Sequence, residues 1–299
     1  MPLRRSVLLA AGDDEARLRA SIATANADLV CLDLEDTVVP ERKGAARAMI
    51  ARLFSADIWG RTQRAYRINA VATPFAHDDV VEVLTACRGR VDTIFMSKAD
   101  GADDVRWVDQ LVSRLSVELG VDQRIGLTVG IESAQALTRV DDIAASSPRI
   151  DALGFAIGDL SNSLGVRVGP YLRNRSLYPG DLYHFVRARI NLAAKARGLQ
   201  SLDGPWPMIN DHATLLEDAR WGAMLGFDGK MALSVDQVKV IHEAYRPSAE
   251  EIQHARRLLA LYEKSAAQGS GHGFIDGEFI DLVSVGQARD TLARAAAPL

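Results

Sequence analysis

The chain has 299 residues, of which 48% are hydrophobic and 25% are charged, and its formal net charge is −4. These values are typical of folded globular proteins and exclude a disordered or fibrous chain. The slightly acidic balance gives no general attraction to nucleic acid or to anionic membranes, so neither is expected as a partner. An anionic ligand would have to be bound by a local group of cations.

The sequence carries two cysteines, Cys31 and Cys87. Two cysteines are too few for a disulfide framework, which favours a reducing, cytoplasmic location. The apolar run near the N-terminus is about five residues long, which is too short for the core of a signal peptide. No stretch approaches the roughly 18 apolar residues that a membrane span requires. We therefore interpret the N-terminal run as the first strand.

Short apolar runs alternate with longer amphipathic segments along most of the chain, which indicates alternating strands and helices. The expected strands are Ser6–Ala10, Asp28–Leu34, Arg64–Asn69, Thr93–Ser97, Ile125–Ile131, Ala152–Ile157, Leu199–Leu202 and Gly229–Leu233. The expected helices are Asp14–Thr24, Glu41–Phe54, Ala76–Cys87, Ala102–Leu119, Ala134–Ala145, Tyr183–Ala196, His212–Leu225 and Val235–Ala244.

Eight such units match a (β/α)8 barrel in number and length, whereas a doubly wound sheet would usually have fewer strands. We therefore predict a TIM barrel over residues 1–246. Residues 247–299 have a different pattern: a charged helix at Ser248–Ala267, a flexible glycine-rich stretch at 268–273, a turn at 275–277 and a final helix. We expect this segment to form a helical arm or lid.

Polar residues follow several of the predicted strands, at the end of a barrel where active sites lie. The second strand is followed by Glu35 and Asp36, the third contains Arg67, and the fourth is followed by Lys98. The planar guanidinium of Arg67 could bind a substrate carboxylate through two hydrogen bonds, or it could form an internal ion pair with Glu35 or Asp36. The acidic cluster could equally belong to the start of the next helix.

Glu132 and Asp159 follow the fifth and sixth strands and are 27 residues apart, which is the length of one βα unit. Two carboxylates on neighbouring strands, with no His or Cys beside them, suit Mg²⁺ better than Zn²⁺. The alternative is that Glu132 only stabilises the first turn of the following helix. The sequence contains no dinucleotide-binding, P-loop or zinc-protease motif, and its six histidines are scattered.

With these residues in view, the chain resembles the citrate lyase beta-subunit-like branch of the HpcH/HpaI aldolase superfamily, which includes malyl-CoA and citramalyl-CoA lyases. The resemblance extends over nearly the whole chain and depends on many motifs in the same order. They are Arg4-Arg5-Ser6-Val7-Leu8, Leu32-Asp33-Leu34-Glu35-Asp36-Thr37-Val38 with Pro40 and Lys43, Arg67-Ile68-Asn69, Ile131-Glu132-Ser133, Gly158-Asp159-Leu160, Gly226-Phe227-Asp228-Gly229-Lys230, Ile275-Asp276-Gly277, Ile280-Asp281 and Gln287-Ala288-Arg289.

The resemblance implies a TIM barrel that uses Mg²⁺ to interconvert a 3-hydroxyacyl-CoA with an acyl-CoA and a 2-oxo acid, often as a homotrimer. It implies that Glu132 and Asp159 bind the metal and that Arg67 binds the oxo-acid carboxylate or its oxyanion. Glu35 and Asp36 would order metal-bound waters, and Lys98 with Gly158, Asp159 and Leu160 would line the substrate site. Asp281, on the arm, would act as general acid/base in the site of a neighbouring subunit.

Some positions depart from the family pattern. Leu9-Ala10-Ala11-Gly12 stands where relatives have Phe-Val-Pro-Gly, Met96-Ser97-Lys98 stands for Leu-Pro-Lys, and Ala232-Leu233-Ser234 stands for Ile-His-Pro. The proline that commonly follows the position of Asp281 is also absent. Because the departures surround the acyl-CoA side, the substrate could differ or lack CoA. Two alternatives to a lyase are a thioesterase for a malyl-type CoA ester and a lyase-related subunit of a multi-enzyme complex.

Overall fold

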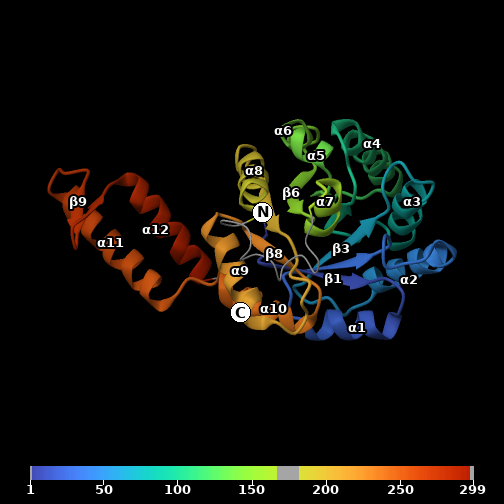
Figure 1. Ribbon diagram of the computed structural model, residues 1–299, viewed down its shortest axis with the longest axis horizontal. Coiled ribbons are helices and arrows are strands. Elements are labelled where there is room, and N and C mark those ends of the chain that lie inside the picture. The colour runs from blue at the N-terminus through green and yellow to red at the C-terminus, as the bar shows by residue number, and fades with distance from the viewer. Residues whose placement is uncertain (1, 167–181, 297–299) are drawn as a thin grey trace. The chain divides into compact units, whose positions relative to one another are not determined.

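The structure is a computed structural model that describes residues 2–166 and 182–296. Contacts divide the chain into two compact units, residues 1–241 and residues 242–299. The first unit is a closed barrel of eight parallel strands in chain order, and the last strand pairs with the first (Figure 1). The strands are β1 Ser6–Ala11, β2 Leu29–Asp33, β3 Gln63–Ile68, β4 Thr93–Met96, β5 Gly126–Ile131, β6 Ile150–Phe155, β7 Gln200–Asp203 and β8 Gly229–Ala232. The predicted (β/α)8 barrel is confirmed.

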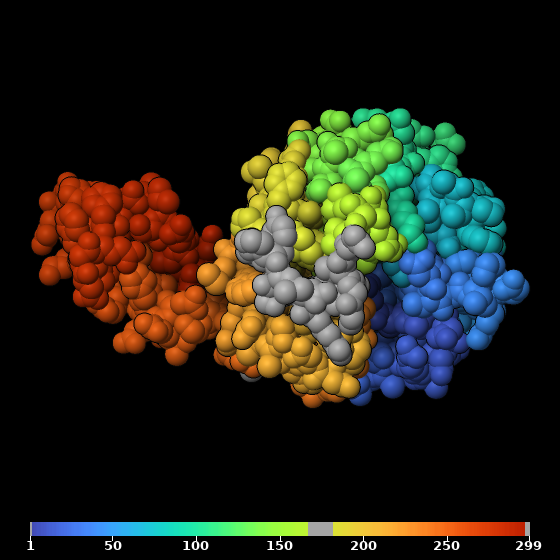
Figure 2. Space-filling view, viewed as in Figure 1, coloured from blue at the N-terminus to red at the C-terminus, as the bar shows by residue number. Residues whose placement is uncertain are grey.

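Helices follow the strands and cover the outside of the barrel. On the face shown in Figure 2, the segments from α1 to α6 pack side by side into a continuous surface. The helices of this unit are α1 Glu15–Thr24, a 3₁₀ turn Pro40–Arg42, α2 Lys43–Ser55, α3 Ala76–Cys87, α4 Ala102–Leu119, α5 Ala134–Thr138, α6 Val140–Ala144, α7 Ile157–Ser163, α8 His184–Lys195, α9 His212–Met224 and α10 Val235–Tyr245, which crosses into the second unit.

Three local predictions were wrong. The helix expected at Ala134–Ala145 is two short helices, because the backbone of Arg139 between them is not helical. The helix expected from Glu41 starts as a 3₁₀ turn at Pro40, which has no N–H to donate and is favoured at the first position. The sixth strand ends at Phe155 rather than at Ile157, and the buried side chain of Ile157 belongs to α7. An apolar run alone does not distinguish a strand end from a short buried helix.

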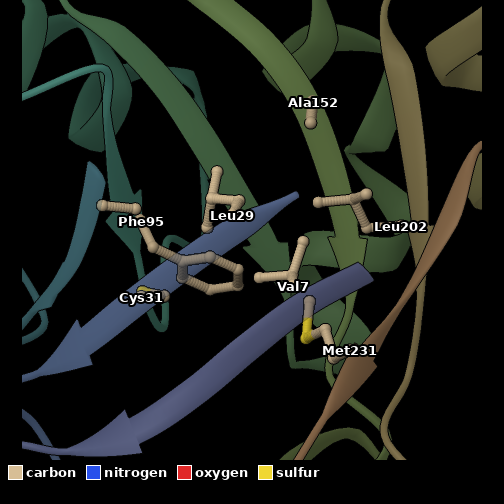
Figure 3. Packing of buried hydrophobic residues seen from close by; sticks show 8 residues of the cluster. Val7, Leu29, Cys31, Phe95, Ala152, Leu202 and Met231 are labelled. Carbon is tan, nitrogen blue, oxygen red and sulfur yellow. The ribbon is translucent and has the colours of Figure 1, made fainter. Parts of the chain in front are cut away.

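The interior of the barrel is closed by side chains beneath the strand ends (Figure 3). The Phe95 ring extends toward Val7 across the centre of the barrel. It fits there because β5 and β6 carry glycine at the facing positions: a Cβ on Gly130 would lie 3.1 Å from the Phe95 ring, and one on Gly154 would lie 3.4 Å from it. The ring therefore forms part of the floor below the carboxyl ends of the strands.

A cluster of buried charges joins two strands to two helices. Lys230 on β8 lies 2.7 Å from Asp203 on β7 and 2.6 Å from Asp218 on α9. Arg187 on α8 contacts the same two carboxylates at 3.0 Å and 2.8 Å. Two cations and two carboxylates compensate each other, and these ion pairs hold α8 and α9 to the barrel wall.

The second unit has its own small core. Helix α11 Ala249–Ala267 packs on α12 Leu282–Ala295, and a hairpin of β9 Gly273–Ile275 and β10 Glu278–Ile280 lies between them in the chain. Its buried side chains are Ala255, Leu258, Ile275, Ile280, Val285 and Ala288. The predicted turn is confirmed: Asp276 and Gly277 both have positive φ, as a tight two-residue hairpin requires. The two strands of the hairpin were not predicted.

Among the described residues, no helix is both long enough and apolar enough to cross a membrane.

Candidate functional site

Polar side chains gather at the carboxyl ends of strands β2 to β5. Asp33 and Arg67 are directly paired in the register of β2 and β3. They lie two residues beyond the core residues Cys31 and Ala65 on their strands, so they point to the same inner side of the barrel. Glu132 follows β5 and lies two residues beyond Gly130. The barrel thus brings a cation between carboxylates from neighbouring strands.

Arg67 is held by two carboxylates. Its Nε donates to Asp33 Oδ1 at 2.6 Å, its Nη2 donates to Asp33 Oδ2 at 2.7 Å, and its Nη1 lies 2.9 Å from Glu35 Oε2. Burial would raise the pKa of Asp33, but the hydrogen bonds and charge of Arg67 hold that pKa below its ordinary value. The internal ion pair with Glu35 that the sequence left open is present. Asp33 was not predicted as a site residue, although its position opposite Arg67 follows from the strand register.

Lys98 supplies a second cation at the same face. Its Nζ donates to Glu35 Oε1 at 2.5 Å and to Asp36 Oδ1 at 3.0 Å. The backbone of Lys98 has a positive φ of 49°, which is uncommon for a residue with a side chain and marks a fixed turn after β4. Burial raises the pKa of Glu35, and Arg67 and Lys98 oppose that shift. The structure therefore brings together Glu35, Asp36, Arg67 and Lys98 as one charged network.

Glu132 is 3% exposed, and its Oε2 is buried without a hydrogen-bond partner within the part of the chain that the structure describes. Burial and the charge of Glu35 raise its pKa to about 8, against the opposing influence of Arg67; Asp159 adds to the shift and Lys98 opposes it. A buried carboxylate oxygen without a donor is costly unless a cation or a proton accompanies it.

The structure places Gly158 and Asp159 in the first turn of α7, not at the end of a strand. Asp159 is half-buried, and its charge acts on Glu132. The Leu160 side chain is completely buried, its N–H donates to the carbonyl of Ala156 and its carbonyl accepts from the N–H of Leu164, so its polar groups are engaged within the helix. The substrate roles of these residues stay predictions.

The donor set fits Mg²⁺. Glu132 and Asp159 offer carboxylate oxygens, one of them orphaned and buried, and Mg²⁺ characteristically takes one or two carboxylates and completes its shell with water and substrate oxygens. Among the described residues, no group of three or more His, Cys, Asp or Glu side chains could hold a metal ion. A cation here would thus have two protein ligands and several positions open to substrate.

Asp281 lies in the second unit, where it caps the N-terminus of α12. Its Oδ1 accepts hydrogen bonds from the backbone N–H groups of Val283 at 2.9 Å and Ser284 at 3.2 Å. The side chain is half-buried, so part of its carboxylate is reachable from solvent. The cap fixes the carboxylate at the exposed end of the helix.

Comparisons with known proteins point to one family. A sequence model described as HpcH/HpaI aldolase/citrate lyase matches residues 5–234. L-malyl-CoA/beta-methylmalyl-CoA lyase of Cereibacter sphaeroides is 34% identical over 283 residues, covering 92% of this chain and 89% of that protein. Citrate lyase subunit beta of Escherichia coli is 29% identical over 293 residues, covering 98% and 93%.

A solved structure agrees with these matches. The protein CitE of Mycobacterium tuberculosis, in complex with magnesium, acetoacetate and coenzyme A, is 30% identical and superposes with a TM-score of 0.78. The alignment covers 99% of each chain, so the likeness includes the second unit as well as the barrel.

Proposed function

Because the chain belongs to the HpcH/HpaI aldolase/citrate lyase family, we propose that it interconverts a 3-hydroxyacyl-CoA of the malyl or citramalyl type with an acyl-CoA and a 2-oxo acid. The predicted family, the carbon–carbon lyase class and the use of Mg²⁺ are confirmed by the matches. The assignment of roles to single residues, the acyl chain and the oxo acid are the proposal.

The observation that supports these roles is the position of Arg67 beside the buried carboxylate of Glu132. A guanidinium has five N–H groups; Arg67 donates two of them to Asp33, and its Nη1 forms an ion pair with Glu35. The remaining N–H groups could donate to the carboxylate of the 2-oxo acid or to the oxyanion formed from it. Because Asp33 fixes the plane of the fork, Arg67 would orient the substrate without a change of its own position.

Glu132 and Asp159 would hold the metal. Bound Mg²⁺ would supply Lewis acidity for the carbonyl and carboxylate oxygens of the 2-oxo acid. Glu35 and Asp36 would order water around the metal, and Lys98 offsets the negative charge of these two carboxylates. The buried position of Glu132 excludes bulk water from one side of the site, which strengthens the electrostatic interactions there.

Asp281 would move the proton at the α-carbon of the acyl-CoA. In the cleavage direction it gives a proton to that carbon after the carbon–carbon bond breaks, and in the synthetic direction it takes the proton away. We propose that it acts in the site of a neighbouring subunit of a homo-oligomer, a trimer. The large apolar side chains exposed around it support a covered surface: Phe274, Phe279, Leu282 and Val283 are each more than half exposed.

The experiment that tests the proposal is mass spectrometry of CoA esters after incubation with acetyl-CoA or propionyl-CoA and a panel of 2-oxo acids, including glyoxylate and pyruvate, with and without Mg²⁺. A Mg²⁺-dependent mass equal to the sum of acyl-CoA and oxo acid is the expected result and names both substrates. Release of free CoA without a 2-oxo acid would identify a thioesterase instead. No reaction with any pair would contradict the proposed substrate class.

A reducing, cytoplasmic location is part of the same proposal. It is supported by Cys31 and Cys87, which are both free and buried.

A further inference from the structure

A buried lysine contacts the backbone of the acidic turn, the segment of residues 33–36 that carries Asp33, Glu35 and Asp36. Lys43 is 5% exposed and is the first residue of α2. Its Nζ donates to the backbone carbonyl of Leu34 at 2.8 Å, to the carbonyl of Glu35 at 3.0 Å and to Asn69 Oδ1 at 2.7 Å. All three N–H bonds of the ammonium group therefore have acceptors, and two of those acceptors are consecutive carbonyls of the turn that carries Glu35.

The same turn is fixed from a second side. Asn69 Nδ2 donates to the Leu34 carbonyl at 3.0 Å and to Asp79 Oδ2 at 2.6 Å. Asp79 is completely buried and pairs with Arg47 at 3.1 Å. A series of polar contacts thus connects α2 and α3, through Asn69 and Lys43, to the backbone of the site. All of these contacts lie within the barrel unit.

The location of Lys43 is unfavourable for a cation that has only a structural role. Burial disfavours its charge, and the positive end of the α2 dipole disfavours it further. The compensating charges are Asp79, Asp33, Glu35 and Asp36, three of which belong to the acidic turn. An apolar residue could fill the same volume without these costs. The interactions of the ammonium group with the acidic turn therefore explain why a lysine occupies this position.

We infer that Lys43 is a positioning residue for the lyase reaction: it fixes the backbone at Leu34 and Glu35, and thereby holds the Glu35 carboxylate between Arg67 and Lys98 beside the metal-binding end of the barrel. This inference rests on the proposed function of the site. Lys43 acts through Glu35 and does not touch substrate. Outer groups that orient a metal site typically change metal affinity or activity by about 10- to 100-fold when they are removed.

The test compares Lys43→Met with Arg47→Met. Arg47 pairs with Asp79, Asp78 and Glu82 at the far end of this series of polar contacts, away from the acidic turn. Its loss should therefore lower Tm while leaving Mg²⁺ binding within about twofold of wild type. Lys43→Met should weaken Mg²⁺ binding about 10-fold or more, measured by calorimetry on the protein without substrate, and should lower kcat more than it raises KM for the acyl-CoA. Equal Mg²⁺ affinity and kcat in Lys43→Met and Arg47→Met would overturn the inference.

Two further measurements cover the cases in which Lys43→Met does not fold or the proposed substrate is wrong. If Lys43→Met does not fold, Asn69→Ala removes one acceptor of Lys43 and one donor to the Leu34 carbonyl, and it should shift Mg²⁺ affinity in the same direction; an unchanged affinity in that variant overturns the inference. If wild-type protein cleaves no CoA ester but Lys43→Met still weakens Mg²⁺ binding, the proposed substrate is wrong and the positioning role is retained.

Discussion

Five carboxylates, those of Asp33, Glu35, Asp36, Glu132 and Asp159, stand around two cations at the mouth of the barrel, Arg67 and Lys98. The cations form ion pairs with Asp33, Glu35 and Asp36, whereas Glu132 Oε2 is buried without a hydrogen-bond partner among the described residues. A divalent cation at Glu132 and Asp159 would offset this excess of negative charge. The raised pKa of Glu132 is the physical sign of that need.

Stability without metal should depend on the protonation of Glu132. Its pKa is raised from 4.5 to about 8 on folding, so its contribution to stability is fully present below pH 4.5 and is lost as the pH rises toward 8. We expect the Tm of metal-free wild type to fall between pH 5 and pH 8, and saturating Mg²⁺ to reverse the fall at pH 8. Thermal unfolding of Glu132→Gln should lack this component; an equal slope in both proteins would contradict the assignment.

Arg67 should not be replaceable by lysine. Arg67→Lys keeps the charge but loses the two parallel hydrogen bonds to Asp33, so the substrate-directed donors lose their orientation. We expect kcat/KM to fall by about 100-fold. The matched control is Arg64→Lys on the same strand, because Arg64 alternates with the inward-facing Ala65 and lies over Trp59 instead. Steady-state kinetics of both variants would refute the role of Arg67 if they lost activity equally.

At the scale of the elements, glycines on neighbouring strands make room for different groups. A Cβ on Gly130 of β5 would lie 2.5 Å from Glu132 Oε1, whereas a Cβ on Gly154 of β6 would lie 2.6 Å from the flexible end of Met231. We expect Gly130→Ala to displace the Glu132 carboxylate and reduce kcat by about 100-fold. Gly154→Ala should instead cost about 1–3 kcal/mol of stability, from overpacking, with little change in kcat.

Kinetics and denaturant unfolding of the two glycine variants give the comparison. Normal activity in Gly130→Ala would show that the strand does not fix the position of Glu132.

The buried charges between the barrel wall and the helices predict a large effect on stability. Lys230→Met removes the ammonium group that pairs with Asp203 and Asp218 and leaves their contacts with Arg187, and breaking such a buried pair costs about 3–5 kcal/mol. Lys239→Met, at a side chain that is 77% exposed, should change stability by less than about 0.5 kcal/mol. Urea unfolding measures both; a loss below about 1 kcal/mol in Lys230→Met would contradict the importance of the cluster.

At the scale of the whole molecule, the proposed function places Asp281 of one subunit in the site of its neighbour. Glu132→Gln and Asp281→Asn should each be almost inactive. If Asp281 acts on a neighbouring subunit, mixed oligomers contain sites with an intact barrel from one variant and an intact arm from the other. Random mixing in a ring makes about a quarter of the sites complete. We therefore expect denaturation and joint refolding of equal amounts to restore up to about a quarter of wild-type activity, whereas no recovery would place Asp281 outside the neighbouring site.

Much of this protein could be predicted from local patterns. The alternation of strands and helices depends on residue periodicity over 5 to 18 residues, so the eight-unit barrel was evident before any contact was known. The spaced motifs indicated the family, the lyase class and Mg²⁺. The boundaries at Arg139 and Phe155 were wrong because short buried helices and strand ends have the same apolar character.

What the sequence determined by itself was therefore the order of the elements, the family and, apart from Asp33, the charged residues that meet at the barrel mouth. Only the tertiary structure decided the partners of those residues. The pairing of Arg67 with Asp33, the orphaned oxygen of Glu132, and the contacts of Lys43 all join residues from different elements. Such contacts arise from strand register and barrel closure, and burial then sets their electrostatic strength, because the same charges interact weakly in the water that surrounds an unfolded chain.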